Sequence, residues 1–147
     1  MKDIDKGFKE AIKKLQTLKN KTLQAGILKD TGTNEGVYIA DYASWNEYGT
    51  EDIPARPFVG STCDEQSSKW NGVIDKIIDK ILVDPSTDVE RLINLLGEQV
   101  VGDIKEKIAN NIPPPNTEGT IRRKKSTKTL IDTGVMRNAI TFEIIGK

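Results

Sequence analysis

The sequence predicts an α+β domain in which a small, mainly antiparallel sheet of about three or four strands packs with an N-terminal helix and a long antiparallel helix hairpin. Two long stretches with apolar residues at helical spacing are joined by only a few residues, which predicts the helix hairpin. Stretches of alternating apolar and polar residues lie near both ends of the chain, which predicts the sheet. Its 147 residues predict a single domain, 1–147.

The first expected element is an amphipathic helix from Ile4 to Leu18. Lysines occupy the faces that the apolar residues leave free. A basic amphipathic helix can also lie on a membrane. We expect core packing instead, because a surface helix that packs on a core needs about as many apolar positions as this helix has. The apolar positions are Ile4, Phe8, Ala11, Ile12, Leu15 and Leu18.

A β-hairpin and a short helix are expected next. Leu23, Ala25 and Ile27 alternate with polar residues and glycine, residues 29–36 are rich in turn-forming residues, and residues 37–39 are again apolar or aromatic. We therefore expect these two stretches to pair, with a mobile tip at 29–36. Residues 40–48 are expected to form a short helix that ends at Gly49.

The helix hairpin follows a rigid, extended connector at residues 53–58, which holds two prolines. The first helix of the hairpin has helical spacing from Trp70 to Leu82 and is stopped by Pro85. Thr87 and Glu90 have the spacing of a capping box for the second helix. That helix should run for about 24 residues, or about 36 Å. Its expected inward residues are Val89, Leu92, Ile93, Leu96, Val100, Ile104 and Ile108.

The C-terminal part is expected to hold a basic connector and one strand. Three consecutive prolines at 113–115 end the second long helix, and residues 113–129 form a polar connector that we expect to be mobile. Ile140, Phe142 and Ile144 alternate with other residues, which predicts the last strand.

Composition removes most enzyme templates. The chain has no histidine, which excludes an imidazole base and histidine zinc sites, and its single cysteine, Cys63, can form neither an internal disulfide nor a cysteine cluster. We expect Cys63 to be a packed thiol. The start of the chain is acidic where a signal peptide is basic, so we expect a soluble protein made in a reducing cytosol. No cofactor, metal or membrane partner is expected.

Charge is unevenly distributed although the formal net charge is +0. Residues 1–29 hold 8 basic and 3 acidic residues (+5), residues 30–118 hold 7 and 17 (−10), and residues 119–147 hold 7 and 2 (+5). These stretches can screen one another within one fold, or opposite charges can meet between copies of the protein.

Two further kinds of site can be compared with the sequence: a carboxylate pair and a phosphate-binding basic run. Among 22 acids some pair could suit glycoside hydrolysis, but Asp75 and Asp79 alternate with lysines as on a solvated helix face. The basic run that begins at Arg122 could bind phosphates of a nucleic acid, although no aromatic residue lies within ten positions to stack a base. A nucleic-acid-binding accessory module using residues 122–128 is therefore the alternative function. The candidate charged interface is Arg122, Arg123, Lys124 and Lys125.

One block of the sequence points to a particular protein family more specifically than the features above. Residues 39–50, IADYASWNEYGT, followed by residues 53–58, IPARPF, resemble the signature of small tail-component or neck proteins of tailed bacteriophages, which act in virion morphogenesis and tail completion. The second half of the chain also resembles this family, because its features follow one another in the family's order. They are three prolines at 113–115, Thr120, basic residues at 123–125, and LIDTG at 130–134, then Met136, Arg137 and Ile140. Many relatives carry histidine where this chain has Asn46.

The resemblance implies a structural, non-enzymatic role at the head-tail junction (neck) or in tail completion, exercised through rings. Its implied partners are other phage neck or tail proteins and further copies of the chain, with nucleic acid limited to DNA passing through an assembled ring. The implied location is the virion, assembled in the bacterial host cytoplasm. The expected motif residues are Glu47, Gly49, Thr50, Arg56, Pro57, Phe58, Leu130, Asp132, Thr133 and Gly134.

We expect five of these residues to form a structural corner instead of an active site: Glu47, Gly49, Arg56, Pro57 and Phe58. Gly49 reverses the chain after Glu47, so Glu47 and Arg56 can face each other and form an ion pair, which the two prolines make stiff.

Overall fold

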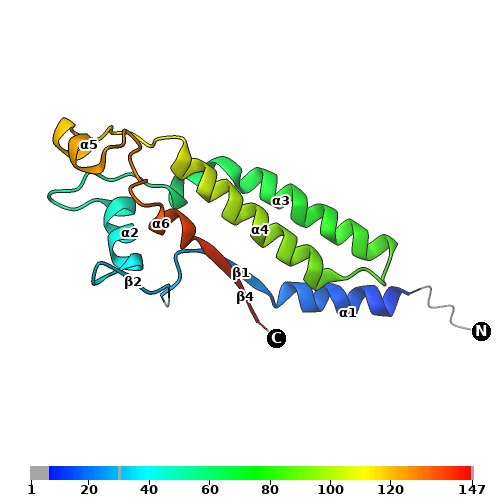
Figure 1. The fold of residues 1–147 in the computed structure, drawn as a ribbon. Helices are drawn as coiled ribbons and strands as arrows, with labels where there is room; N and C mark the ends of the chain where they lie inside the picture. Colours follow the sequence, from blue (N-terminus) through cyan, green and yellow to red (C-terminus); the bar gives the residue numbers. More distant parts are fainter. Residues whose placement is uncertain (1–6, 30, 147) are drawn as a thin grey trace, which may run out of the picture.

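The computed structural model describes residues 7–29 and 31–146 (Figure 1). Ile4, expected in the first helix, and residue 30, expected in the hairpin tip, lie outside the described residues. The α+β class with a long helix hairpin is confirmed. In chain order the elements are α1 (Phe8–Lys19), β1 (Thr22–Gly26), β2 (Thr33–Asn34), β3 (Val37–Tyr38), α2 (Ile39–Tyr48), α3 (Val59–Val83), α4 (Val89–Ala109), α5 (Glu118–Lys124), α6 (Val135–Asn138) and β4 (Thr141–Ile145).

Helices α3 and α4 form the antiparallel hairpin that the sequence predicts (Figure 1). Helix α4 has 21 residues, a little fewer than expected, and α3 has 25. Helical spacing of apolar residues correctly predicted the inward face of α4, on which only Leu92 is half-buried instead of buried. The buried residues of that face are Val89, Ile93, Leu96, Gly97, Val100, Ile104 and Ile108.

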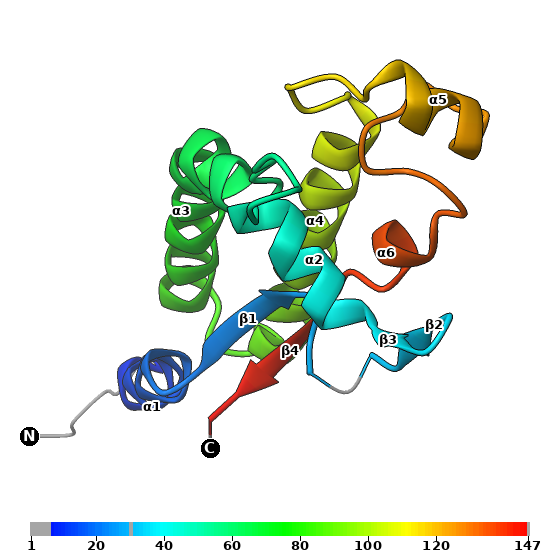
Figure 2. The ribbon, with the colours of Figure 1, turned by 90° about the vertical axis from the view of Figure 1, so that its left-hand side faces the viewer.

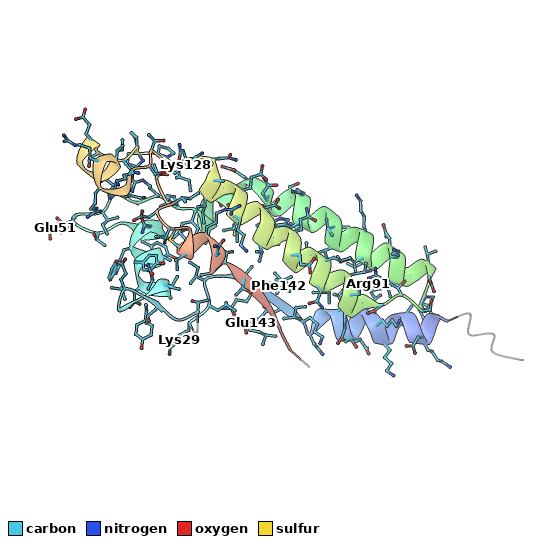
Figure 3. All side chains as sticks on the ribbon, in the orientation of Figure 1. Lys29, Glu51, Arg91, Lys128, Phe142 and Glu143 are labelled. Atoms are coloured by element: carbon cyan, nitrogen blue, oxygen red, sulfur yellow. The ribbon has the colours of Figure 1, made fainter. Side chains whose placement is uncertain are left out.

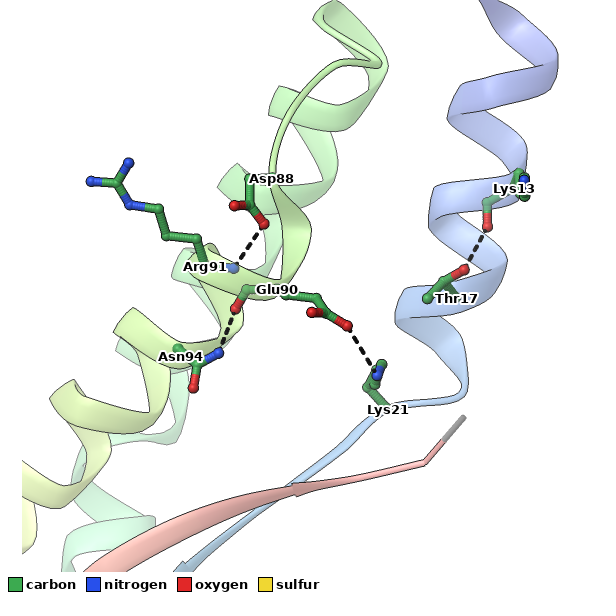
Figure 4. Close-up of polar contacts among 7 residues, drawn as sticks. All are labelled: Lys13, Thr17, Lys21, Asp88, Glu90, Arg91 and Asn94. Atoms are coloured by element: carbon green, nitrogen blue, oxygen red, sulfur yellow. Dashed lines mark hydrogen bonds and ion pairs between the residues drawn. The ribbon is translucent and has the colours of Figure 1, made fainter.

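The start of α4 differs from the expected capping box. Asp88, not Thr87, is the N-cap, and its carboxylate accepts the Arg91 backbone N–H at 3.1 Å (Figure 4). The Thr87 hydroxyl instead donates to the Lys80 carbonyl at 3.3 Å, because the tight connection brings it against the end of α3. Glu90 pairs with Lys21 at 3.6 Å, which links α4 to the start of β1 (Figure 4).

The expected hairpin between residues 23–27 and 37–39 is wrong. Strand β1 pairs with β4 in antiparallel register, Thr22 opposite Ile145 and Gly26 opposite Thr141. Strands β2 and β3 form their own short hairpin within and just after the expected tip. Alternation of apolar and polar residues identifies a strand but not its partner. Strand β1 pairs with β4 instead of residues 37–39 because the β1–β4 pair packs against α4.

Phe142 of β4 packs against α4 at Gly97, where a Cβ atom would overlap the aromatic ring. The missing side chain therefore sets how closely the strand pair approaches the helix.

Helix α1 packs on the hairpin as expected, but only with part of its apolar face. Ala11 is buried and Leu15 and Leu18 are half-buried in one cluster with Ile77 and Ile81 of α3. The expectation fails for Phe8 and Ile12, which are 68% and 39% exposed. Among the described helices, none has both the length and the apolar character needed to cross a membrane.

The elements gather at two ends of an elongated molecule (Figure 1). Helix α1 and the α3–α4 turn lie at one end, and α2, the β2–β3 hairpin, α5 and α6 lie at the other (Figures 1 and 2). The lysines of α1 and the basic run 122–125 therefore sit far apart (Figure 1), although the two basic stretches of the chain meet where β1 pairs with β4. Helix α5, inside the expected connector, and helix α6 were not predicted, because neither carries a periodic apolar pattern long enough to recognise.

Candidate interaction groove

Helices α2, α5 and α6 and the β2–β3 hairpin lie together at one end of the molecule (Figure 2). Residues of this end line an open groove of about 640 Å³. One side comes from residues 34–56 and the other from residues 115–136. Both sequence blocks that carry the phage resemblance therefore contribute to one surface. The apolar and aromatic lining residues are Val37, Tyr42, Trp45, Ile53, Pro54, Pro115, Leu130, Val135 and Met136.

The expected ion pair between Glu47 and Arg56 is wrong. Glu47 instead reaches from α2 to the first backbone N–H groups of α3: one carboxylate oxygen accepts from Phe58 at 2.7 Å and Val59 at 2.9 Å, and the other accepts from Gly60 at 2.8 Å. Phe58, the N-cap residue of α3, has no side chain that can accept these bonds. The carboxylate also lies at the positive end of the helix dipole, so Glu47 caps α3 from another element.

Arg56 is 6% exposed and joins the two sequence blocks. Its Nε donates to the Pro114 carbonyl at 2.8 Å and its Nη2 to the Pro115 carbonyl at 3.3 Å, while its backbone N–H donates to the Asn46 carbonyl at 2.6 Å. Burial lowers the pKa of Arg56. The two bonds to Pro114 and Pro115 hold the 113–115 segment in place. The partners of the guanidinium are uncharged backbone carbonyls and not a carboxylate.

The chain reversal between Glu47 and Arg56 is built by Gly49 and Thr50. Gly49 has φ +78°, its N–H donates to the Trp45 carbonyl at 2.9 Å, and a Cβ there would lie 2.9 Å from the Ala55 nitrogen. The Thr50 hydroxyl accepts the Ile53 N–H at 3.0 Å, and the Thr50 N–H donates to the Ile53 carbonyl at 2.8 Å. The turn is thus closed from both sides.

Phe58, Leu130 and Met136 are buried in one core cluster beneath the groove. Pro57, which precedes Phe58, is exposed. The other expected residues of the second block, Asp132, Thr133 and Gly134, line the groove. Thr129, next to Leu130, is 6% exposed, and its hydroxyl has no hydrogen-bond partner among the residues that the structure describes.

The basic run is divided between the groove and the outer surface. Arg123 and Lys124 line the groove, whereas Arg122 and Lys125 are exposed outside it. The Lys124 ammonium donates to the carbonyls of Lys128 and Thr129, at 3.3 Å each. Burial lowers the pKa of Lys124, as do the neighbouring charges of Arg56 and Arg123, while Asp132 opposes the shift. Lys128 donates to the Ala109 carbonyl at 2.8 Å, where α4 ends (Figure 3).

Of the ten expected motif residues, Arg56, Leu130 and the stretch 132–134 line the groove. The other five are not among the lining residues and lie between the last turn of α2 and the start of α3. Sequence reasoning missed Tyr42 and Trp45 as lining residues. Their spacing of three positions in a short helix, which places both on one face, was the available signal.

The groove combines apolar surface with charge of both signs. Arg56, Arg123 and Lys124 supply the cations, and Glu35, Asp52 and Asp132 supply the acids. Aromatic and apolar side chains together with fixed cations suit contact with a polypeptide segment that carries a carboxylate. Within 7–29 and 31–146, no three Cys, Asp or Glu residues gather as a metal site.

Cys63 lies outside the groove lining, on α3, and is exposed instead of packed as expected. Partial burial of the thiol, followed by the charges of Asp64 and Glu47, raises its pKa. The thiol therefore lacks the electropositive surroundings of a reactive cysteine.

Comparisons of the chain with protein-family models, with curated proteins and with solved structures found no match.

Proposed function

We propose that this protein is a structural assembly protein of a tailed bacteriophage or prophage, acting at the head-tail junction or in tail completion through ring-forming protein contacts. The observation that carries the proposal is the convergence of the two resemblance blocks on one groove, where Arg56 bonds to carbonyls 58 and 59 residues away. Residues of one signature are expected to serve one surface, and the five of the ten expected motif residues that line this groove support the proposal.

In this role the protein is a non-catalytic component of the virion, assembled in the host cytoplasm. Its partners are other neck or tail proteins and further copies of itself, and DNA only passes through the finished ring. Exposed aromatic residues at the groove end support such contacts, since Tyr38 and Trp45 are 60% and 42% exposed.

The alternative, nucleic-acid binding by residues 122–128, has weaker support. Two of its five cations, Lys124 and Lys128, donate to carbonyls of the protein itself, so their positions are set by the fold. The remaining three exposed cations offer few phosphate contacts.

Gene neighbourhood is the first test: portal and capsid genes on one side and tail genes on the other support the proposal, and metabolic neighbours contradict it. The decisive experiment deletes the gene from the phage or prophage and examines particles by electron microscopy. Filled heads without joined, complete tails are expected. Normal infectious particles without the gene product would overturn the proposal.

Complementation then tests the groove. Wild-type protein should restore particles, and Trp45→Asp, which places a charge on the apolar lining, should not. Tyr48→Asp is the matched control, because Tyr48 is an exposed aromatic residue of the same helix that is not among the groove-lining residues. Equal complementation by both variants would show that the groove is not the assembly surface.

A further inference from the structure

Arg56 holds a buried positive charge that no acid of the described chain neutralises. Its side chain donates only to the uncharged carbonyls of Pro114 and Pro115. Within residues 7–29 and 31–146, no carboxylate forms an ion pair with the guanidinium, and its Nη1 has no hydrogen-bond partner. Buried charges in proteins are normally paired. A counter-ion from outside the described chain is therefore expected at Arg56.

A second cation, Lys124, lies near Arg56, and both residues line the groove. Burial lowers the pKa of Lys124, and the charge of Arg56 adds to that shift. The Lys124 ammonium donates to the carbonyls of Lys128 and Thr129, which leaves one of its three donors. The guanidinium keeps three of its five N–H donors. These two cations therefore have donors left for a ligand that enters the groove.

The acids of the lining limit how much negative charge the ligand can carry. Asp132 lies close enough to Lys124 to oppose the lowering of its pKa, and Glu35 and Asp52 also line the groove. A phosphate dianion, or a nucleic-acid chain with one charge per nucleotide, would be repelled by these carboxylates. A group with one negative charge gains the contact with Arg56 and meets less repulsion. The mixed lining therefore favours a carboxylate over a phosphate.

The apolar part of the lining indicates what the carboxylate is attached to. The Arg56 backbone N–H donates to the Asn46 carbonyl at 2.6 Å, so Arg56 lies beside the turn of α2 that carries Trp45. Trp45 is 42% exposed and lines the same side of the groove, while Leu130 and Met136 line the other side. A carboxylate on an apolar group therefore finds suitable surface for both of its parts.

We propose that Arg56 and Lys124 form an anion subsite in the groove, and that its ligand is one carboxylate of a partner polypeptide segment that is otherwise apolar. The free N–H groups of the Arg56 guanidinium donate to the carboxylate oxygens, and the Lys124 ammonium adds a second positive charge. The apolar residues of the segment lie against Trp45 and the other apolar lining. The inference deepens the proposed function and rests on it only for which polypeptide carries the carboxylate.

An NMR titration of the purified chain tests the subsite with a matched pair of probes. N-acetyl-L-leucine carries a carboxylate on an apolar group, and N-acetyl-L-leucinamide is its uncharged counterpart. The carboxylate should give saturable shifts of the Arg56 side-chain N–H and Trp45 indole N–H signals. It should bind at least about tenfold more tightly than the amide, which lacks the charged hydrogen bond. Trp70 is the internal control, since its indole donates to Asp103 at 2.8 Å and it is not among the groove-lining residues.

Three results of this titration would overturn the proposal. The first is no saturable shift at Arg56 and Trp45, or an equal shift at Trp70. The second is equal binding of the carboxylate and the amide, which would leave an apolar groove without an anion subsite. The third comes from inorganic phosphate at the same ionic strength, which should bind more weakly than the carboxylate. Tighter binding of phosphate would make phosphate the ligand instead.

Two substitutions locate the bound carboxylate. Arg56→Gln should weaken binding at least about tenfold, because the charged donor is lost. Asp132→Asn leaves Arg56 in place and removes an acid near Lys124, so it should strengthen binding severalfold. Glu51→Gln is the control for Asp132→Asn, since Glu51 is an exposed acid that is not among the groove-lining residues, and it should bind like the wild type.

The Asp132→Asn variant keeps the test decisive if Arg56→Gln does not fold. Unchanged or weaker binding in Asp132→Asn would place the carboxylate away from Lys124 and overturn the proposal, as would wild-type binding in a folded Arg56→Gln. These measurements use no phage component, so a failed gene-deletion test leaves them unchanged. A failed titration leaves the assembly role standing, since an uncharged segment can also fill an apolar groove.

Discussion

Glu47 replaces a local N-cap for α3 with a carboxylate from α2. Glu47→Ala should lower the free energy of unfolding by about 2–3 kcal/mol, because three backbone N–H groups lose a charged acceptor. Glu47→Gln should cost less, since an amide oxygen still accepts without the charge. Urea denaturation measures both. Glu51→Gln, at an exposed acid in the turn after α2, is the control and should change stability by less than about 0.5 kcal/mol.

Arg56 is a stabilising residue at the same corner. Arg56→Ala should cost about 2 kcal/mol, because the carbonyls of Pro114 and Pro115 lose their donors. The stability of Arg56→Lys should lie between that of the wild type and that of Arg56→Ala, since one ammonium cannot reproduce the forked donors of a guanidinium. Thermal unfolding measures the effect, and an unchanged melting temperature in Arg56→Ala would contradict the assignment.

Gly97 and Gly102 lie on the same helix but have different surroundings. Gly97→Ala should destabilise by about 1–3 kcal/mol, because its Cβ overlaps the Phe142 ring and pushes the strand pair away from α4. Gly102→Ala should be neutral or stabilise by up to about 1 kcal/mol, since nothing lies within 4 Å of its Cβ position and alanine favours the helix. Denaturant midpoints of the two variants should therefore move in opposite directions or by clearly different amounts.

At the scale of elements, α5 is the least anchored helix. It has 7 residues, and none of them is buried. The expectation that residues 113–129 and 29–36 are mobile stays a prediction, and limited trypsin digestion tests it. Cleavage should come first after Arg122, Arg123 or Lys125, with Lys29 as a second site. Primary cleavage within α4, which lies in the core, would contradict it.

At the scale of the whole molecule, charge and assembly are linked. We expect the purified chain to be a monomer or small oligomer at micromolar concentration, because contacts between exposed charges are weak and are screened over about 8 Å at physiological ionic strength. Light scattering across a salt series should show association falling as salt rises. A stable ring that persists in about 1 M salt, where the screening length is about 3 Å, would show an apolar interface instead.

The sequence by itself determined the α+β class, the helix hairpin with its end near Pro85, the inward face of α4, and the strand at the C-terminus. These features depend on hydrogen bonds and periodicity within a few residues, so neighbours in the chain encode them. The tertiary structure alone decided the pairing of β1 with β4, the capping of α3 by Glu47 and the bonds of Arg56 to residues 114 and 115. Each of those joins distant parts of the chain, where several polar or apolar partners satisfy the local pattern equally and only packing of the whole fold selects one.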